Sequence, residues 1–178
     1  MPTLYAQPGD PSVTGFHFES AAEFWAKARR LRDMDNGQVG DFELRFADGQ
    51  LLDAELFKAI GVSQGELASF FDAAHNWTVD QKVHAIVAVS EFGVGFPLSE
   101  AEADAIDIDL YLVNNLHDLA LKFVEDGVFG EVPEELEKYI DYDAIVHDLN
   151  KTYRMATFAG VSCAFSGSHE TAAERHAG

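Results

Sequence analysis

The sequence predicts an α+β fold, with strands first, helices in the middle, and strands and helices again toward the end. Alternating apolar residues indicate strands near both ends of the chain. Between them, Ser or Thr followed three residues later by Glu or Gln marks several helix starts. The chain has 178 residues, of which 47% are hydrophobic. This length suffices for one substantial domain or for two to three small ones.

We divide the chain into three small domains and a tail. The ranges are 1–61 for an N-terminal α+β domain, 62–98 for a central helical domain, 99–165 for an acidic α+β domain and 166–178 for the tail. Gly61 ends the first domain, and Gly93, Gly95 and Pro97 break the last helix of the second. The tail is small and polar and is expected to be disordered.

Three short strands and two helices are expected in the N-terminal domain. The strands cover Thr3–Ala6, Gly15–Glu19 and Phe42–Phe46. Ser20 and Glu23 form a capping box that begins a helix extending to about Met34. A shorter helix near Asp53–Ile60 stops at Gly61.

Two further capping boxes predict the central helices. Ser63 with Glu66 begins a helix that buries Leu and Phe side chains. Thr78 with Gln81 begins a helix over Val79–Phe92. The high apolar fraction of the second helix predicts a central position in the fold.

The third domain is expected to begin with an acidic segment and a strand. Ser99–Ala105 is compatible with one helical turn. Ile106–Val113 alternates apolar and polar residues, so a half-buried strand is expected, with Asp107, Asp109 and Tyr111 on its solvent face.

Helices and a terminal hairpin are expected to complete this domain. Asn115 caps a helix to Asp126, and Gly127 follows where a left-handed glycine ends helices. Pro133 suits the first position of the next helix. The remaining elements are a helix at Tyr142–Asn150 and strands at Thr152–Ala159 and Val161–Phe165.

The charge of the chain is unusual. Acidic residues outnumber basic ones by 31 to 12, which gives a net charge of −19 and a pI near 4.4. Between Glu91 and Asp148 there are 16 acids and two bases. Such a charge excludes non-specific attraction to DNA, RNA or an anionic membrane, so the expected partner is basic. A surface that serves only solubility normally intersperses both signs.

Fifteen carboxylates of this region are candidate partner-binding groups in the role of phosphates. They are Glu100, Glu102, Asp104, Asp107, Asp109, Asp118, Glu125, Asp126, Glu131, Glu134, Glu135, Glu137, Asp141, Asp143 and Asp148. Apolar residues are interleaved with them over Val124–Leu149, so this segment is expected to fold, unlike a disordered acidic tail. We expect the apolar side chains to lie beneath the carboxylates and hold them rigidly.

The spacing of these acids is close to that of charges on DNA. Duplex DNA presents one charge per about 1.7 Å of its axis. A helix rises about 1.5 Å and a strand about 3.3 Å per residue, so acids at every one to three residues approach this density. A groove lined with Lys and Arg to bind phosphates would then meet carboxylates.

Catalytic and metal-binding motifs are not found in the sequence. It contains no HExxH, CxxC, EF-hand loop or GxSxG. Cys163 lies in an apolar strand, where an inert buried thiol is expected. We therefore expect no catalysis, no cofactor and no metal. Two alternatives remain: a metal-assisted hydrolase that uses Asp104, Asp107, Asp109 and a histidine, and a general acidic adaptor for basic DNA-binding proteins.

The sequence also predicts a soluble, cytoplasmic protein. The N-terminus lacks the basic region and apolar run of a signal peptide. The apolar stretches fall short of the roughly 20 residues that span a bilayer. A single cysteine excludes an internal disulfide and favours a reducing compartment.

Three stretches of the chain resemble the ArdA antirestriction family. They are Pro2–Ala6, Gly15–Ser20 and above all Gly127–Leu149. Within the last, Phe129–Pro133 and Tyr139–Ile145 resemble the family's C-terminal signature, which includes its antirestriction motif. The resemblance covers about residues 1–157, and the extension at 166–178 lies outside it.

This resemblance implies an elongated, curved homodimer of three small domains per chain that imitates bent B-form DNA. Members of the family occupy the DNA-binding groove of Type I restriction–modification enzymes, block cleavage and often, less strongly, methylation, and are typically encoded on mobile elements. The motif lies near the dimer junction, which implies a motif- or dimer-supporting role for Phe129, Gly130, Pro133, Tyr139 and Tyr142. The basic cluster Lys27–Arg32 is a departure, because a continuous DNA mimic would be less basic there.

Overall fold

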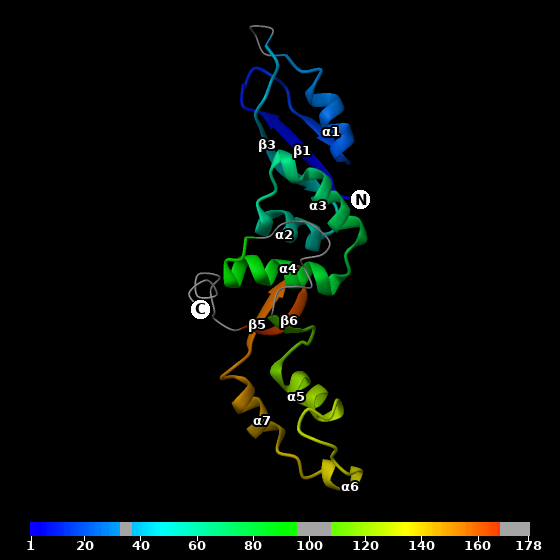
Figure 1. Cartoon of the computed structure of the whole chain (residues 1–178), viewed down its shortest axis with the longest axis vertical. Coiled ribbons are helices and arrows are strands. Elements are labelled where there is room, and N and C mark those ends of the chain that lie inside the picture. The colour runs from blue at the N-terminus through cyan, green and yellow to red at the C-terminus, as the bar shows by residue number, and fades with distance from the viewer. Residues whose placement is uncertain (33–36, 96–107, 168–178) are drawn as a thin grey trace, which may run out of the picture. The chain divides into compact units, whose positions relative to one another are not determined.

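A computed structural model of the protein describes residues 1–32, 37–95 and 108–167 (Figure 1). Helices combine with two small antiparallel sheets of three strands each, which confirms the expected α+β class. The chain forms two compact units, residues 1–106 and 107–178. No helix of the described residues has the length and apolarity needed to cross a membrane.

The first unit begins with a sheet in the order β2-β1-β3. Its strands are β1 (Thr3–Pro8), β2 (Phe16–Phe18) and β3 (Phe42–Asp48). Leu4 of β1 pairs with Phe18 on one side and Phe46 on the other. Leu4 and Phe18 are buried together with Phe24 of α1 (Ala21–Ala28), which packs against β2.

Helix α1 is shorter than the sequence predicts. Ser20 caps its start by accepting a hydrogen bond from the Glu23 backbone N–H at 3.2 Å, as expected. The helix ends at Ala28, however, so the prediction that it extends to about Met34 is wrong. After Ala28 the backbone hydrogen bonds span three residues and not four: Arg30 N donates to Lys27 O, and Leu31 N donates to Ala28 O. This 3-10 spacing ends the α-helix.

Three further α-helices lie in the part of the first unit that the structure describes. They are α2 (Leu51–Ile60), α3 (Leu67–Asn76) and α4 (Val79–Phe92). Both predicted capping boxes are confirmed, although the one at Ser63 opens a 3-10 turn, Gln64–Glu66, that precedes α3. Helix α2 packs against α4, and Lys82 of α4 forms a buried ion pair with Asp53 of α2. Contacts therefore cross the division expected after Gly61, and the three-domain layout stays a prediction.

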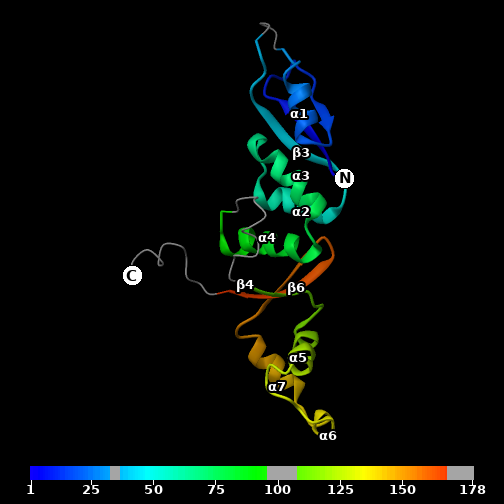
Figure 2. The same cartoon turned by 45° about the vertical axis from the view of Figure 1, so that its right-hand side comes forward.

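The described part of the second unit combines a sheet with three helices. The strands β4 (Ile108–Tyr111), β5 (Arg154–Phe158) and β6 (Val161–Gly167) lie in the order β4-β6-β5. The helices are α5 (Leu116–Glu125), the short α6 (Glu134–Glu137) and α7 (Tyr142–Leu149). Figures 1 and 2 both show α5 and α7 side by side. Their buried core consists of Leu116, Leu119, Ala120, Phe123, Leu149 and Ala164.

Several details of the second unit differ from the sequence predictions. Tyr111 does not simply face solvent: it is half-buried against the core of this unit, and its ring lies 5.2 Å from the ring of Phe123 of α5. Ser166 and Gly167 belong to β6, so the expected tail does not begin at 166. Pro133 is the N-cap of α6 and not its first residue.

Three other predictions on this part of the chain are confirmed. Asn115 caps α5, and Gly127 adopts the expected left-handed conformation with φ 71°. Cys163 is buried, as predicted. The expected turn at Ser99–Ala105 and the tail beyond Gly167 lie outside the described residues.

Candidate partner-binding surface

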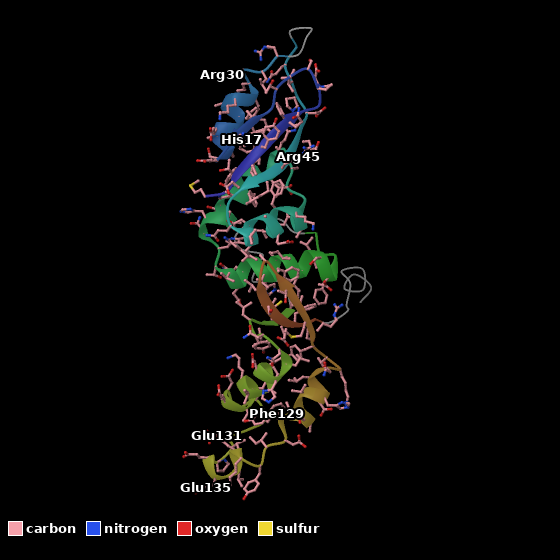
Figure 3. All side chains as sticks on the ribbon, turned by 180° about the vertical axis from the view of Figure 1, so that it is seen from behind. His17, Arg30, Arg45, Phe129, Glu131 and Glu135 are labelled. Carbon is pink, nitrogen blue, oxygen red and sulfur yellow. The ribbon has the colours of Figure 1, made fainter. Side chains whose placement is uncertain are left out.

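Eleven of the fifteen candidate carboxylates fall within the described residues. Glu100, Glu102, Asp104 and Asp107 lie outside them. Ten of the eleven are exposed, and Asp118 is half-buried. The exposed ones are Asp109, Glu125, Asp126, Glu131, Glu134, Glu135, Glu137, Asp141, Asp143 and Asp148. In Figure 3, Glu131 and Glu135 are labelled near α6, which lies at one end of the second unit.

Most of these carboxylates have no cationic partner. In the part of the second unit that the structure describes, the ion pairs are Lys122 Nζ–Asp126 Oδ2 at 2.8 Å and Lys151 Nζ–Asp148 Oδ1 at 2.7 Å. The hydrogen bond from Lys151 lowers the pKa of Asp148, and the one to Asp126 raises the pKa of Lys122. Nine of the eleven carboxylates therefore remain uncompensated by lysine or arginine within residues 108–167.

Helix starts position several of the acids. Asp141 is the N-cap of α7, and its carboxylate accepts a hydrogen bond from Ala144 N at 3.0 Å. Glu134, Glu135 and Glu137 make up three of the four residues of α6, directly after Pro133. Negative charge is favourable in the first turn of a helix, so these positions stabilise the acids that they display.

Asp109 has a more internal role than expected. Burial raises the pKa of Tyr153 to about 12, and the negative charge of Asp109 and the neighbouring Tyr111 add to this effect. The rings of Tyr111 and Tyr153 lie 6.1 Å apart. Asp109 thus interacts with this tyrosine pair although the residue itself is exposed. No pattern in the sequence pointed to a role for Tyr153, which lies in the connection before β5.

The residues with an expected motif or dimer role form an exposed, partly apolar segment. Phe129 is 57% and Tyr139 is 74% exposed, whereas Tyr142 is half-buried against the core. Gly130 has a φ of 96°, which favours glycine at this turn. Val128 and Leu136 are also exposed. The expectation that the interleaved apolar side chains all lie beneath the carboxylates is therefore wrong for this segment.

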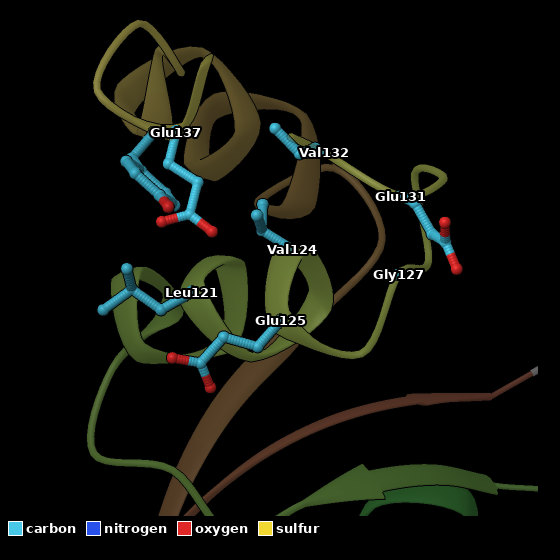
Figure 4. A pocket seen from close by; sticks show the side chains of 8 residues that line it. Leu121, Val124, Glu125, Gly127, Glu131, Val132 and Glu137 are labelled. Atoms are coloured by element: carbon cyan, nitrogen blue, oxygen red, sulfur yellow. The ribbon is translucent and has the colours of Figure 1, made fainter. Parts of the chain in front are cut away.

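Two hollows border this segment. The side chain of Phe129 forms one wall of a cavity of about 310 Å³ beside α7; its other lining residues are Ala144, Ile145, Asp148, Leu149 and Thr152. A larger groove of about 550 Å³ lies between α5 and the chain around α6 (Figure 4). It is lined by Leu121, Val124, Glu125, Gly127, Glu131, Val132, Glu137 and Tyr142.

Half of the basic cluster at Lys27–Arg32 serves the fold. Lys27 Nζ binds Glu23 Oε1 and the His17 carbonyl, each at 2.7 Å. Arg32 Nη1 donates to the carbonyls of Arg29 and Leu31, each at 2.8 Å, and so satisfies two backbone acceptors after α1. Arg30 remains exposed beside Arg29 (Figure 3).

The structure brings no metal-binding cluster together among the residues it describes. Two members of the alternative metal set, Asp104 and Asp107, lie outside those residues. The hydrolase alternative therefore stays a prediction.

The fold and this surface define an acidic α+β protein that displays uncompensated carboxylates on a folded unit. No model of a protein family matches the chain, and a search of curated proteins finds no match either. The resemblance to the antirestriction family thus remains a prediction that rests on the residues quoted above.

Proposed function

We propose that the protein is a non-catalytic antirestriction protein, a DNA mimic that occupies the DNA-binding groove of a Type I restriction–modification enzyme. One observation carries the proposal: nine carboxylates of the described second unit have no lysine or arginine partner there, although the segment that bears them is folded. An acidic surface that served solubility alone would be expected to intersperse both signs.

The energetic basis is the release of counterions. The lysines and arginines of a phosphate-binding groove release the cations condensed on DNA, and the affinity therefore falls steeply with salt. Carboxylates fixed by a folded unit offer the same exchange without an ordering cost at binding. Each exposed charge contributes little, about 0.5 kcal/mol, so inhibition depends on the number of acids.

The proposed assembly is a homodimer bound to the methyltransferase core of the enzyme. Exposed apolar side chains around the proposed motif support an additional protein contact, because large apolar groups on a surface often mark an interface. Phe129 and Tyr139 are the residues we assign to this dimer contact.

The test is displacement of a labelled DNA duplex from a purified Type I methyltransferase core. The test variant changes Glu131, Glu134, Glu135 and Asp143 to amides. Four exposed charges at ~0.5 kcal/mol each predict about thirtyfold weaker displacement. The matched control makes the same charge change in the first unit, at Asp41, Glu55, Asp72 and Asp80.

The results separate the candidate functions. The control variant should displace DNA almost as well as the natural chain, and Glu134→Gln alone should cost about twofold. If Glu134→Gln abolished displacement, distributed mimicry would be wrong. If the protein bound the enzyme and duplex DNA did not compete with it, a general acidic adaptor would be indicated.

A further inference from the structure

The groove between α5 and α6 combines apolar lining residues with carboxylates at its rim. Leu121 and Val124 of α5, together with Val132, contribute the apolar side chains. Glu125 and Glu137 contribute exposed carboxylates from α5 and α6. Figure 4 shows the Glu137 side chain extending toward α5, whereas Glu131 lies at the opposite end and points away.

The nearest lysines in sequence form no ion pair with these two carboxylates, although the charge of Glu125 helps to raise the pKa of Lys122. Lys122 pairs with Asp126 at 2.8 Å, one turn further along α5. Lys138 Nζ lies 5.1 Å from the centre of the Tyr139 ring. Neither Glu125 nor Glu137 has an ion pair with the cations of residues 108–167 that the structure describes. The groove thus keeps its negative charge beside apolar surface.

We infer that this groove receives an arginine or lysine side chain of the protein partner. Long cationic side chains lay their methylene stems along apolar surface while the charged group reaches polar partners. Here the stem would lie on Leu121, Val124 and Val132, and the cation would bind Glu125 and Glu137. Arginine suits the site better than lysine, because its planar group donates in a fork and is more weakly hydrated.

Other occupants fit the groove less well. A phosphate or an anionic lipid would be repelled by the two carboxylates. A neutral apolar segment would remove water from the carboxylates without replacing their hydrogen bonds, which is costly. A basic side chain offers both an apolar stem for the apolar lining residues and a positive charge for the carboxylates.

This inference deepens the proposed function and takes its choice of partner from it. It adds an anchoring contact to an otherwise distributed surface. Charges that are partly removed from water are screened less by salt than exposed ones. The contribution of Glu125 and Glu137 should therefore persist at salt concentrations that weaken the remaining carboxylates.

The first test compares two pairs of substitutions in the DNA displacement assay. The groove pair is Glu125→Gln with Glu137→Gln, and the control pair is Glu134→Gln with Glu135→Gln, which changes the charge equally. We expect about a hundredfold loss for the groove pair, because charge-assisted hydrogen bonds are lost. The control pair should lose about fivefold. Thermal unfolding checks that both variants are folded.

The second test does not need the restriction enzyme. The methyl groups of Leu121, Val124 and Val132 are followed by NMR while acetyl-Gly-Gly-Arg-Gly-Gly-amide is added, with the Gln peptide as control. Saturable shifts with the arginine peptide, absent in the groove-pair variant, are expected. Equal responses to both peptides, or equal losses from the two substitution pairs, would overturn the inference. If the natural chain displaced no DNA, the proposed function would fail, and the peptide titration would still decide the groove.

Discussion

Replacing Lys82 with methionine is expected to destabilise the first unit strongly. The Lys82 ammonium lies 2.6 Å from the Asp53 carboxylate and donates to the Ala74 carbonyl at 2.8 Å. Only 5% of Lys82 and 3% of Asp53 are exposed. Because Lys82→Met leaves a buried carboxylate without its partner, we expect the free energy of unfolding to fall by about 3–5 kcal/mol.

Calorimetry of three variants measures this effect. For a chain of this length, the expected loss corresponds to a fall in Tm of about 6–20 °C. The double variant Lys82→Met with Asp53→Leu removes both charges and should recover much of the loss. Lys151→Met serves as the surface control; it breaks the fully exposed pair with Asp148 and should lower the stability far less than Lys82→Met.

The outcome for Lys82→Met decides the reasoning about the buried pair. A loss no larger than that of Lys151→Met would refute it. DNA displacement by the folded variant should be unchanged at low temperature, because the nine carboxylates without an ion pair that carry the proposal lie in the other unit. The experiment therefore separates effects on stability from effects on the proposed surface.

Three further predictions concern the second unit. The raised pKa of Tyr153, about 12, favours its neutral hydroxyl in the folded chain, so the stability it contributes is complete below pH 10 and is lost as the pH rises through 12. Urea unfolding at pH 9 and pH 11.5 should show this loss in the natural chain but less of it in Tyr153→Phe; equal losses would contradict the role of Asp109 and burial. Tyr139→Ser should shift the proposed homodimer toward monomer in sedimentation equilibrium, and an unchanged dimer would place the interface elsewhere. Gly127→Ala should lower the free energy of unfolding by about 1–2 kcal/mol because φ is positive there, whereas Gly40→Ala, with open space and ordinary φ, should cost less than half of that.

Local signals in the sequence predicted local structure well. The caps at Ser63, Thr78 and Asn115 are found as expected, because a cap depends on residues within three positions of it. The end of α1 was not predicted. Its helical pattern continues past Ala28, but Arg32 donates to the backbone carbonyls of Arg29 and Leu31 and forms an antiparallel β-bridge with Gln38.

Features that depend on distant contacts were missed. Alternation places Tyr111 and Asp109 on one face of β4, but it does not predict that the Tyr111 ring contacts Phe123 of α5. The sequence also assigned the apolar residues near Phe129 to the interior, because composition does not distinguish a core from an exposed contact surface.

The candidate carboxylates were identified from the sequence, but their surroundings were not. Lys122 and Asp126 are four residues apart on a helix, so their pair is predictable. Glu125 and Glu137 are twelve positions apart, and they share a groove only because the chain turns after α5 at Gly127 and begins α6 after Pro133.

The most direct test of mimicry measures the affinity of the protein for a Type I methyltransferase core from low to moderate salt, beside that of the enzyme's own DNA site. Mimicry predicts mutually exclusive binding and a steep decline in both affinities as salt rises. Simultaneous binding of protein and DNA, or an affinity for the protein that does not change with salt, would contradict the account.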